Sequence, residues 1–444
     1  MLYNDLKQYV GKGMASFHTP GHKGFKIFNE PIWNLDLTEL PETDSLFEAS
    51  GILFKAEERV KILFGSDKSL ISAGGNTLCI QTMLRLASLD RKRMLAGRNI
   101  HRAAIGAMAL LGIQPEWIIP DKDAGFSLPG RINSEKVAHN LDKIKVPSAV
   151  YITSPDYYGV LSDIQNIAIE CRKRDALLIV DNAHGTHLKF LKNSLHPLDL
   201  GASMSADSAH KTLPVLTGGA WLHIKGQNLA QRAKEAMALF GSTSPSYPIM
   251  CTLDLCTKYL FERGKKDFWE LSEQSERIKK IAQRKGMLVP QGQCDPTRIT
   301  FSAQPLGYSG KYMSKYLRIN GIEPEFCDEN YVVLIPSPFN SREDWNRLER
   351  CISDIKPKRN VNFEKKLKEY SKNIFIPKAH LTLREAIFAN HKKIPLENAL
   401  GKIAGDIICP CPPGVPVVMP GEIIGIYEKE ALKRYGISEI CVVK

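Results

Sequence analysis

The chain has 444 residues, 43% of them hydrophobic and 24% charged, with a formal net charge of +12. This length and balance predict a globular protein of two or three domains. No apolar run could cross a membrane, and the first residues lack the apolar core of a secretory signal, so neither a membrane protein nor an exported one is expected. Ten cysteines without disulfide-framework spacing favour a reducing, cytoplasmic setting.

The positive charge is spread in short clusters at residues 91–93, 172–174 and 356–359, and no aromatic residues interleave them. A surface that binds single-stranded nucleic acid would combine basic and aromatic side chains. We therefore interpret the clusters as solvated helix ends, and nucleic acid is not an expected partner.

Between about residues 54 and 224, helical and strand-like segments alternate. Amphipathic helices are predicted over residues 54–65, 76–89 and 163–176. The predicted strands are residues 68–72, 93–97, 115–120, 148–155, 176–181 and 220–224. Short strands that are apolar throughout and alternate with helices indicate an α/β fold with a mainly parallel sheet, covered on both faces.

After about residue 261 the pattern changes to a long polar helix over residues 263–286, followed by segments typical of a smaller α+β unit. A charged connector then leads to a proline-rich C-terminal part. The predicted units are an N-terminal segment (1–50), a major domain (51–260), a small α+β domain (261–360) and a C-terminal subdomain (361–444).

Two strands end in groups that can bind a ligand. The strand over residues 68–72 runs through Gly74 and Gly75 into a helix, which is the arrangement of a phosphate cradle, although an ordinary strand-to-helix turn has the same pattern. The strand over residues 176–181 ends at Asp181. A carboxylate there needs a partner, and a helix cap or a structural ion pair is the alternative to a ligand.

Lys211 is predicted to stand at the end of another short strand, among small side chains and beside His210. Burial favours the neutral, nucleophilic form of a lysine. A phosphate cradle, a buried aspartate and a nucleophilic lysine, each after a strand, are the three groups that pyridoxal phosphate needs. The sequence therefore predicts pyridoxal 5'-phosphate as the cofactor.

Five segments carry a resemblance to a known family. They are "SFHTPGHKG" (16–24), "DNAHGTH" (181–187), "DSAHKTLPVLTGGAWL" (207–222), "STSPSYPIM" (242–250) and "PCPPGVPVVMPGE" (410–422). In this order they resemble the ornithine/lysine/arginine decarboxylases, which are fold-type-I, aspartate-aminotransferase-like enzymes that use pyridoxal phosphate. The length is similar to that of members without an N-terminal wing domain.

The resemblance implies a role for each matching residue. Lys211 corresponds to the lysine that binds the cofactor covalently, Asp181 to the carboxylate on the pyridinium, His101 to the histidine that stacks on the ring, and His184 to a position beside the ring. The implied phosphate-binding residues are Gly75, Asn76, Thr77, Ser208 and His210.

The resemblance also implies that two subunits share an active site. Thr243 lies in a loop that, in the family, reaches the phosphate of the neighbouring subunit, so a homodimer with a shared active site is expected, and further assembly stays open. A basic amino acid needs acceptors for its cationic side chain, and Asp44 and Glu422 are the residues that the resemblance implies.

Four positions depart from the family pattern. Asn182 stands where a glutamate is frequent, Ser45 where an aspartate is common, Cys411 where a tyrosine is usual, and Asn76 where other members have Ser or Thr. The changes at Ser45 and Cys411 lie near the expected substrate contacts, so they affect the expected choice of substrate more than the expected reaction.

The expected function is pyridoxal-phosphate-dependent decarboxylation of arginine, lysine or ornithine to the corresponding amine and carbon dioxide. One alternative is another fold-type-I reaction, such as transamination or elimination, with Arg298 or Arg318 holding the α-carboxylate. A second is a non-catalytic regulatory or nucleic-acid-binding protein, which the net charge motivates. No metal site is expected, because the histidines near residue 20 and the cysteines near residue 410 lack further ligands.

Overall fold

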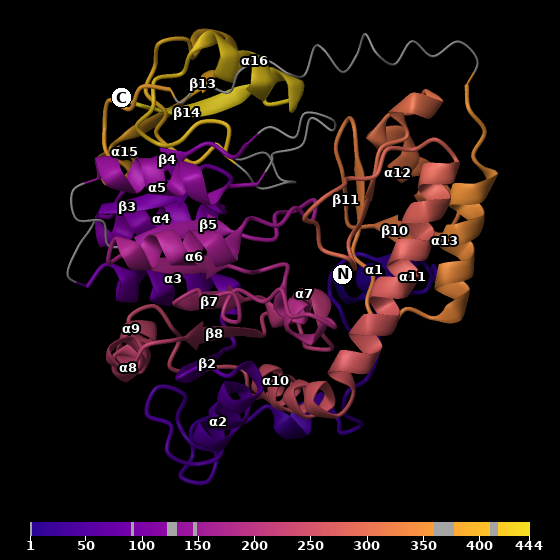
Figure 1. Cartoon of the computed structure of the whole chain (residues 1–444), viewed down its shortest axis with the longest axis horizontal. Helices are drawn as coiled ribbons and strands as arrows, with labels where there is room; N and C mark the ends of the chain where they lie inside the picture. Colours follow the sequence, from indigo (N-terminus) through magenta and orange to yellow (C-terminus); the bar gives the residue numbers. More distant parts are fainter. Residues whose placement is uncertain (1, 90–92, 122–130, 145–148, 359–376, 409–415) are drawn as a thin grey trace.

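Seven strands form the central sheet, in the order β2-β8-β7-β6-β5-β3-β4 (Figure 1). The structure, a computed structural model, describes residues 2–89, 93–121, 131–144, 149–358, 377–408 and 416–444. The strands are β2 (Lys68–Ser72), β3 (Arg93–Gly97), β4 (Gln114–Ile118), β5 (Ala149–Thr153), β6 (Leu177–Asp181), β7 (Met204–Asp207) and β8 (Ala220–Ile224). All except β7 coincide closely with strands predicted above.

The sheet is mainly parallel, as predicted. The pairs β3–β4, β3–β5, β5–β6 and β6–β7 are parallel, and β8 runs antiparallel to both β7 and β2. Every residue of β8 is buried, which explains its apolar sequence. The carboxyl ends of the parallel strands share one edge of the sheet, where ligands bind in open α/β folds.

Helices cover both faces of this sheet. One face packs against α3 (Gly75–Ala87), α4 (Arg102–Leu111) and α9 (Ala233–Ala238) in a single apolar cluster. The other face packs against α5 (Ser134–Lys143) and α6 (Ile164–Lys173). The remaining helices of this part are α2 (Ile52–Phe64), η2 (Thr186–Phe190), α7 (Ala209–Thr212), α8 (Gln227–Gln231) and α10 (Tyr247–Tyr259).

The small α+β unit lies beside the sheet (Figure 1). Its three-stranded antiparallel sheet has the order β11-β12-β9. Its elements are α11 (Lys265–Arg284), β9 (Ile299–Phe301), η4 (Gln304–Leu306), α12 (Gly310–Ile319), β10 (Ile322–Pro324), β11 (Phe326–Cys327), β12 (Val332–Leu334) and α13 (Arg342–Asp354). The five residues of η3 (Leu260–Gly264) join α10 to α11 without a break.

The N-terminal segment contacts two parts of the molecule, the small unit and the helix α7. It contains α1 (Leu2–Val10), β1 (Ala15–Phe17) and η1 (Ile32–Leu35). The strand β1 pairs in parallel with β10 of the small unit. Gly21 packs against α7, where an added Cβ would come within 2.4 Å of the backbone of Thr212. The segment therefore connects the small unit to the helix that carries Lys211.

The C-terminal subdomain has its own apolar core. Its elements are α15 (Leu383–Phe388), β13 (His391–Pro395), η5 (Leu396–Asn398), α16 (Ile426–Arg434) and β14 (Glu439–Val443), with β13 and β14 antiparallel. Helix α15 packs against α4 of the major domain. Across all described residues, we find no helix with the length and apolarity that a bilayer crossing requires.

Candidate active site

A cavity of about 280 Å³ opens at the carboxyl edge of the sheet, where β5 and β6 end and α3 begins. Its volume is near the lower end of small-molecule sites, about 300–1,000 Å³. It is lined by Gly75, Asn76, Thr77, Ile80, Asn99, His101, Thr153, Asp156, Tyr157, Tyr158, Asp181, Ala183, His184, Ser208, His210 and Lys211. The structure thus brings together every predicted cofactor-binding residue except Thr243, and their roles stay predictions.

Lys211 lies on the one-turn helix α7, four residues after β7, and not at a strand end as the sequence suggested. Its Nζ is 3.1 Å from Nε2 of His184. Burial lowers the pKa of Lys211 below its ordinary value, although the charges of Asp181 and Glu325 oppose that shift. The amine is therefore easier to deprotonate than a surface lysine, as a nucleophile requires.

His184 stays neutral beside this amine. Burial lowers the pKa of His184 well below its ordinary value, and the nearby charge of Lys211 lowers it further. The ring of Tyr157 packs edge-on against the imidazole, with centroids 4.9 Å apart. A neutral imidazole can exchange a proton with Lys211, which suits an acid–base role.

Asp181 is buried, with 1% of its surface exposed, and neutral donors surround it. Its Oδ1 accepts from Asn76 Nδ2 at 3.0 Å and from the Ala183 N–H at 3.2 Å, and its Oδ2 accepts from the Tyr151 hydroxyl at 3.1 Å. Burial raises the pKa of Tyr151, so the phenol stays a donor. A buried carboxylate held in this way can stabilise a cation in the adjacent cavity.

The first turn of α3 forms the other end of the cavity. Gly75 has φ +70°, a conformation that favours glycine, and its N–H donates to Gly218 O at 2.8 Å. The following N–H groups belong to the start of the helix, where backbone donors lack intrahelical acceptors. Because the Asn76 amide is engaged by Asp181, we expect its phosphate contact to come from the backbone. Ser208 and His210 face this end with side chains 3.3 Å apart.

His101 occupies the N-cap position of α4. Its Nδ1 accepts from the Ala103 N–H at 3.2 Å, which leaves the proton of the neutral ring on Nε2. The cap therefore fixes the tautomer and orientation of a ring that lines the cavity.

Three predicted residues lie outside this cavity in the single chain. Thr243 is exposed on the loop before α10. Asp44 accepts backbone N–H bonds from residues 45, 50, 51, 53 and 54, which places it at the start of α2. Glu422 forms a buried ion pair with Arg98. The side chains of Asp44 and Glu422 are therefore already engaged, and Cys411 lies outside the described residues.

Sequence reasoning missed several groups around the cavity. Asp156, Tyr157 and Tyr158 follow β5 at the same edge as Asp181, so the rule that located Asp181 would have found them. Burial raises the pKa of Asp156 to about 7.

Two further residues approach the site from the small unit. Glu325 accepts from the Tyr157 hydroxyl at 2.5 Å, and Arg298 donates to His184 O at 3.2 Å. Both come from the small unit, far away in sequence.

Comparison with known families matches both parts of the chain. The sequence profile described as "Orn/Lys/Arg decarboxylase, major domain" matches residues 1–301, and the one described as "Orn/Lys/Arg decarboxylase, C-terminal domain" matches residues 367–435. The chain belongs to the Orn/Lys/Arg decarboxylase family. The predicted family, and with it an amino-acid decarboxylase, is confirmed.

Relatives of this decarboxylase match along nearly its whole length. An arginine decarboxylase of Bacillus subtilis is 27% identical, over 95% of this chain and 91% of the relative. An arginine decarboxylase of Halalkalibacterium halodurans is also 27% identical, over 95% and 90%. The lysine decarboxylase of Francisella novicida, at 20% identity, superposes with a TM-score of 0.80 over 94% of this chain and 75% of that one. The last comparison shows a shared fold, which confirms the predicted fold class.

The ion pair of Glu422 gives a first testable prediction for the decarboxylase. Arg98 donates to both carboxylate oxygens, at 2.6 and 2.7 Å, and both side chains are buried. Glu422→Gln leaves the guanidinium without its anion, so the free energy of unfolding should fall by about 3–5 kcal/mol in urea denaturation. Glu397→Gln, at an exposed carboxylate that pairs with Lys429, is the control and should leave the free energy of unfolding nearly unchanged. Unchanged stability with a raised KM would place Glu422 in substrate binding instead.

Proposed function

We propose that this protein is a pyridoxal-phosphate-dependent decarboxylase of a basic L-amino acid: arginine, lysine or ornithine. The observation that carries the proposal is the convergence of Lys211, Asp181 and the first turn of α3 on one cavity. Two kinds of relative support the substrate class, because the matches include proteins named arginine decarboxylase and lysine decarboxylase.

The residues present fit the cofactor. The start of α3, Ser208 and His210 would hold the phosphate, Lys211 would bind the aldehyde carbon, and Asp181 would face the ring nitrogen. Bound pyridoxal phosphate supplies an electron sink for the bond that breaks at the α-carbon. A buried carboxylate stabilises the protonated ring nitrogen that this chemistry needs. His101 would pack against the ring from its position at the cap of α4.

The chain itself contributes substrate contacts and proton transfer. Arg298 is buried, and its Nη1 has no hydrogen-bond partner among the described residues, so it can bind the substrate α-carboxylate. Burial alone would raise the pKa of Glu325, but hydrogen bonds from Tyr157 and the Thr19 N–H leave it below its ordinary value. Glu325 is thus an anion near Lys211 and can attract a basic substrate. Lys211 or His184 returns a proton to the α-carbon.

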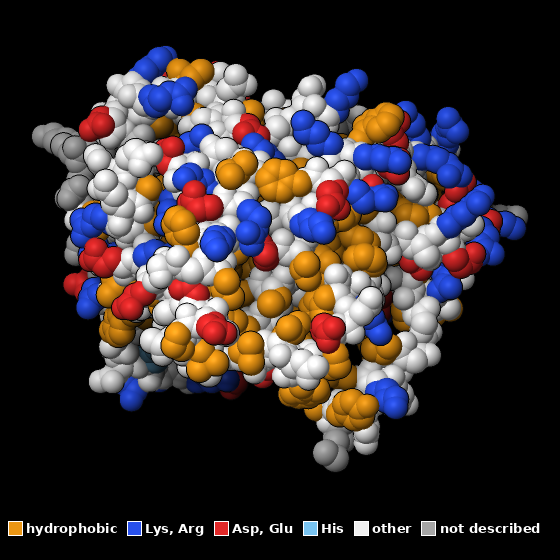
Figure 2. All heavy atoms as spheres, turned by 90° about the horizontal axis from the view of Figure 1, so that it is seen from below, with side chains coloured by type: hydrophobic (Ala, Val, Ile, Leu, Met, Phe, Trp, Pro, Cys, Tyr) orange, Lys and Arg blue, Asp and Glu red, His pale blue; other side chains and the backbone are white. Residues whose placement is uncertain are grey.

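A homodimer with a shared active site forms part of the proposal. Figure 2 shows hydrophobic side chains gathering on the face where α2 lies. Exposed apolar side chains that gather on one face suit an interaction surface. The exposed apolar residues of this region include Ile32, Trp33, Leu37, Leu40, Ile52, Phe54 and Ile62. The exposed Thr243 would then reach the phosphate of the partner, and dimers can assemble further.

Carbon dioxide release tests the reaction type. The holoenzyme, given each basic amino acid in turn, should release carbon dioxide and one amine in equal amounts. Formation of a keto acid without carbon dioxide would favour an aminotransferase, for which Arg298 provides the same carboxylate contact. Salt-sensitive RNA binding without either product would favour a non-catalytic protein.

The pH dependence of cofactor capture follows from the environment of Lys211. Only the neutral amine attacks an aldehyde, so the capture rate of the apoenzyme should rise with pH, with a midpoint below the ordinary lysine pKa of 10.5. The charge of Glu325 raises the pKa of Lys211, so Glu325→Gln should move the midpoint to lower pH. Stopped-flow absorbance measures this, and Glu323→Gln, at a surface pair with Arg318, is the control. An unmoved midpoint in Glu325→Gln would show that its charge does not reach Lys211.

A further inference from the structure

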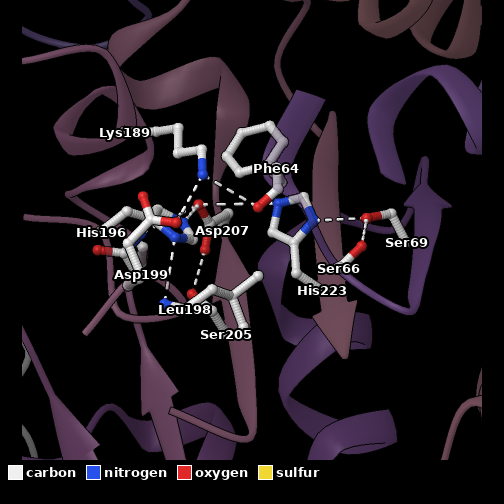
Figure 3. A network of polar contacts seen from close by, with 12 residues as sticks. Phe64, Ser66, Ser69, Lys189, His196, Leu198, Asp199, Ser205, Asp207 and His223 are labelled. Atoms are coloured by element: carbon white, nitrogen blue, oxygen red, sulfur yellow. Dashed lines mark hydrogen bonds and ion pairs between the residues drawn. The ribbon is translucent and has the colours of Figure 1, made fainter. Parts of the chain in front are cut away.

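A buried polar network surrounds Asp207, the last residue of β7 (Figure 3). Asp207 is fully buried. Its Oδ1 accepts from Ser205 Oγ at 2.5 Å, and its Oδ2 accepts from His196 Nε2 at 2.8 Å and from Asn182 Nδ2 at 3.0 Å. Side chains alternate along a strand, so Asp207 lies on the sheet face opposite its neighbour Ala206, which pairs with Asp181. The network is therefore behind the cavity.

Two of the three donors to Asp207, the Ser205 hydroxyl and the Asn182 amide, are neutral. The Leu198 N–H donates to His196 Nδ1 at 3.3 Å, so the proton of this imidazole is on Nε2 and points to Asp207. His223 lies 4.0 Å from the same oxygen, and burial lowers its pKa to about 3. In this structure His196, Asp207 and His223 therefore form a hydrogen-bonded carboxylate site.

Asn182 connects this network to the cavity. It directly follows Asp181, its N–H donates to Ala206 O at 2.9 Å, and its side chain reaches Asp207 on the neighbouring strand. Position 182 is also one of the departures noted above, since a glutamate is frequent there in the family. In this chain the carboxylate of the pair is the last residue of β7, and the amide is the residue that follows β6.

We propose that Asp207 is a positioning residue for the cofactor site. Through Asn182 it fixes the ends of β6 and β7, which carry Asp181 and, four residues further along, Lys211. A buried anion is costly unless hydrogen bonds hold it, and those hydrogen bonds impose one geometry on the groups around it. A displacement of about 1 Å at a reacting group can cost about a hundredfold. The inference rests on the proposed function, because the geometry matters only if a cofactor binds between Asp181 and Lys211.

An exchange of the two side chains tests the proposal. Asp207→Asn leaves two amides facing each other, and Asn182→Asp places two carboxylates at about 3.0 Å. The double variant, with Asp at 182 and Asn at 207, restores one acid and one amide of the same shapes. Asp199→Asn is the matched control, since Asp199 is an exposed carboxylate that pairs with Lys189.

The readouts are the dissociation constant of pyridoxal phosphate, from absorbance titration of the apoprotein, and the melting temperature of the apoprotein. We expect each single variant to bind the cofactor about tenfold or more weakly than wild type. The dissociation constant of the double variant should return to within about threefold of the wild-type value, and that of Asp199→Asn should equal it.

Two results would overturn the proposal: single variants that lower only the melting temperature, with unchanged cofactor affinity, or a double variant no better than the single variants. Failure of the proposed function is seen separately, as a wild-type protein that does not bind pyridoxal phosphate.

Discussion

Lys211→Ala is expected to abolish turnover and to remove the borohydride-reducible yellow chromophore of the holoenzyme. The side chain combines the two properties that covalent cofactor binding needs: a pKa lowered by burial and a position in the cavity, 3.1 Å from His184. Loss of the nucleophile should lower kcat by at least about 10³-fold. Turnover with each basic amino acid and the absorbance spectrum before and after borohydride measure the effect.

Lys23→Gln is the matched control for this variant. Lys23 is a half-buried lysine, and burial lowers its pKa to about 7. Its Nζ, however, donates to the carbonyl oxygens of His18 and Ile335, and it does not line the cavity. We expect Lys23→Gln to keep the chromophore. A chromophore that survives Lys211→Ala and disappears in Lys23→Gln would reverse the assignment.

Asp181→Asn is expected to have the second-largest effect, a decrease in kcat of about 10²–10³-fold. The amide has nearly the same shape and retains an acceptor for the hydroxyl of Tyr151, but it carries no charge to stabilise a protonated ring nitrogen. Steady-state kinetics of the holoenzyme with its preferred amino acid measure the change. Because Lys211 is intact, the chromophore should persist.

Asp254→Asn provides the control for this substitution, because Asp254 pairs with Arg59 near the surface and away from the cavity. It should have wild-type kcat. If Asp181→Asn also had wild-type kcat, the carboxylate would not face the ring nitrogen, and its bonds to Asn76 and Ala183 would be structural.

Much of the fold was predictable because its signals are local. The strands of a sheet buried on both faces read as short apolar runs, and the helices between them show amphipathic periodicity, so β2, β3, β5, β6 and β8 were identified from residues close together in sequence. The edge rule for parallel strands then placed Asp181 and the start of α3 at one cavity. The pairing of β1 with β10 was not predicted, because it joins segments about 300 residues apart.

The limits of the site prediction also follow from distance in sequence. Asp44 and Glu422 were chosen as acceptors for the substrate, yet Asp44 caps α2 through nearby backbone N–H groups. Glu422 binds Arg98, a partner that is distant in sequence and that only the folded chain shows. Tyr151 donates a hydrogen bond to Asp181, but nothing in the sequence distinguished it from any other aromatic residue in a buried strand. Glu325 and Arg298 approach Lys211 from the small unit, so only the folded chain shows their proximity.

Mass-spectrometric mapping of the borohydride-reduced holoenzyme tests the central claim most directly. We expect one pyridoxyl group per chain, on the peptide that contains Lys211. A pyridoxyl group on another lysine, or none after saturation with pyridoxal phosphate, would contradict the assignment of Lys211 as the residue that binds the cofactor.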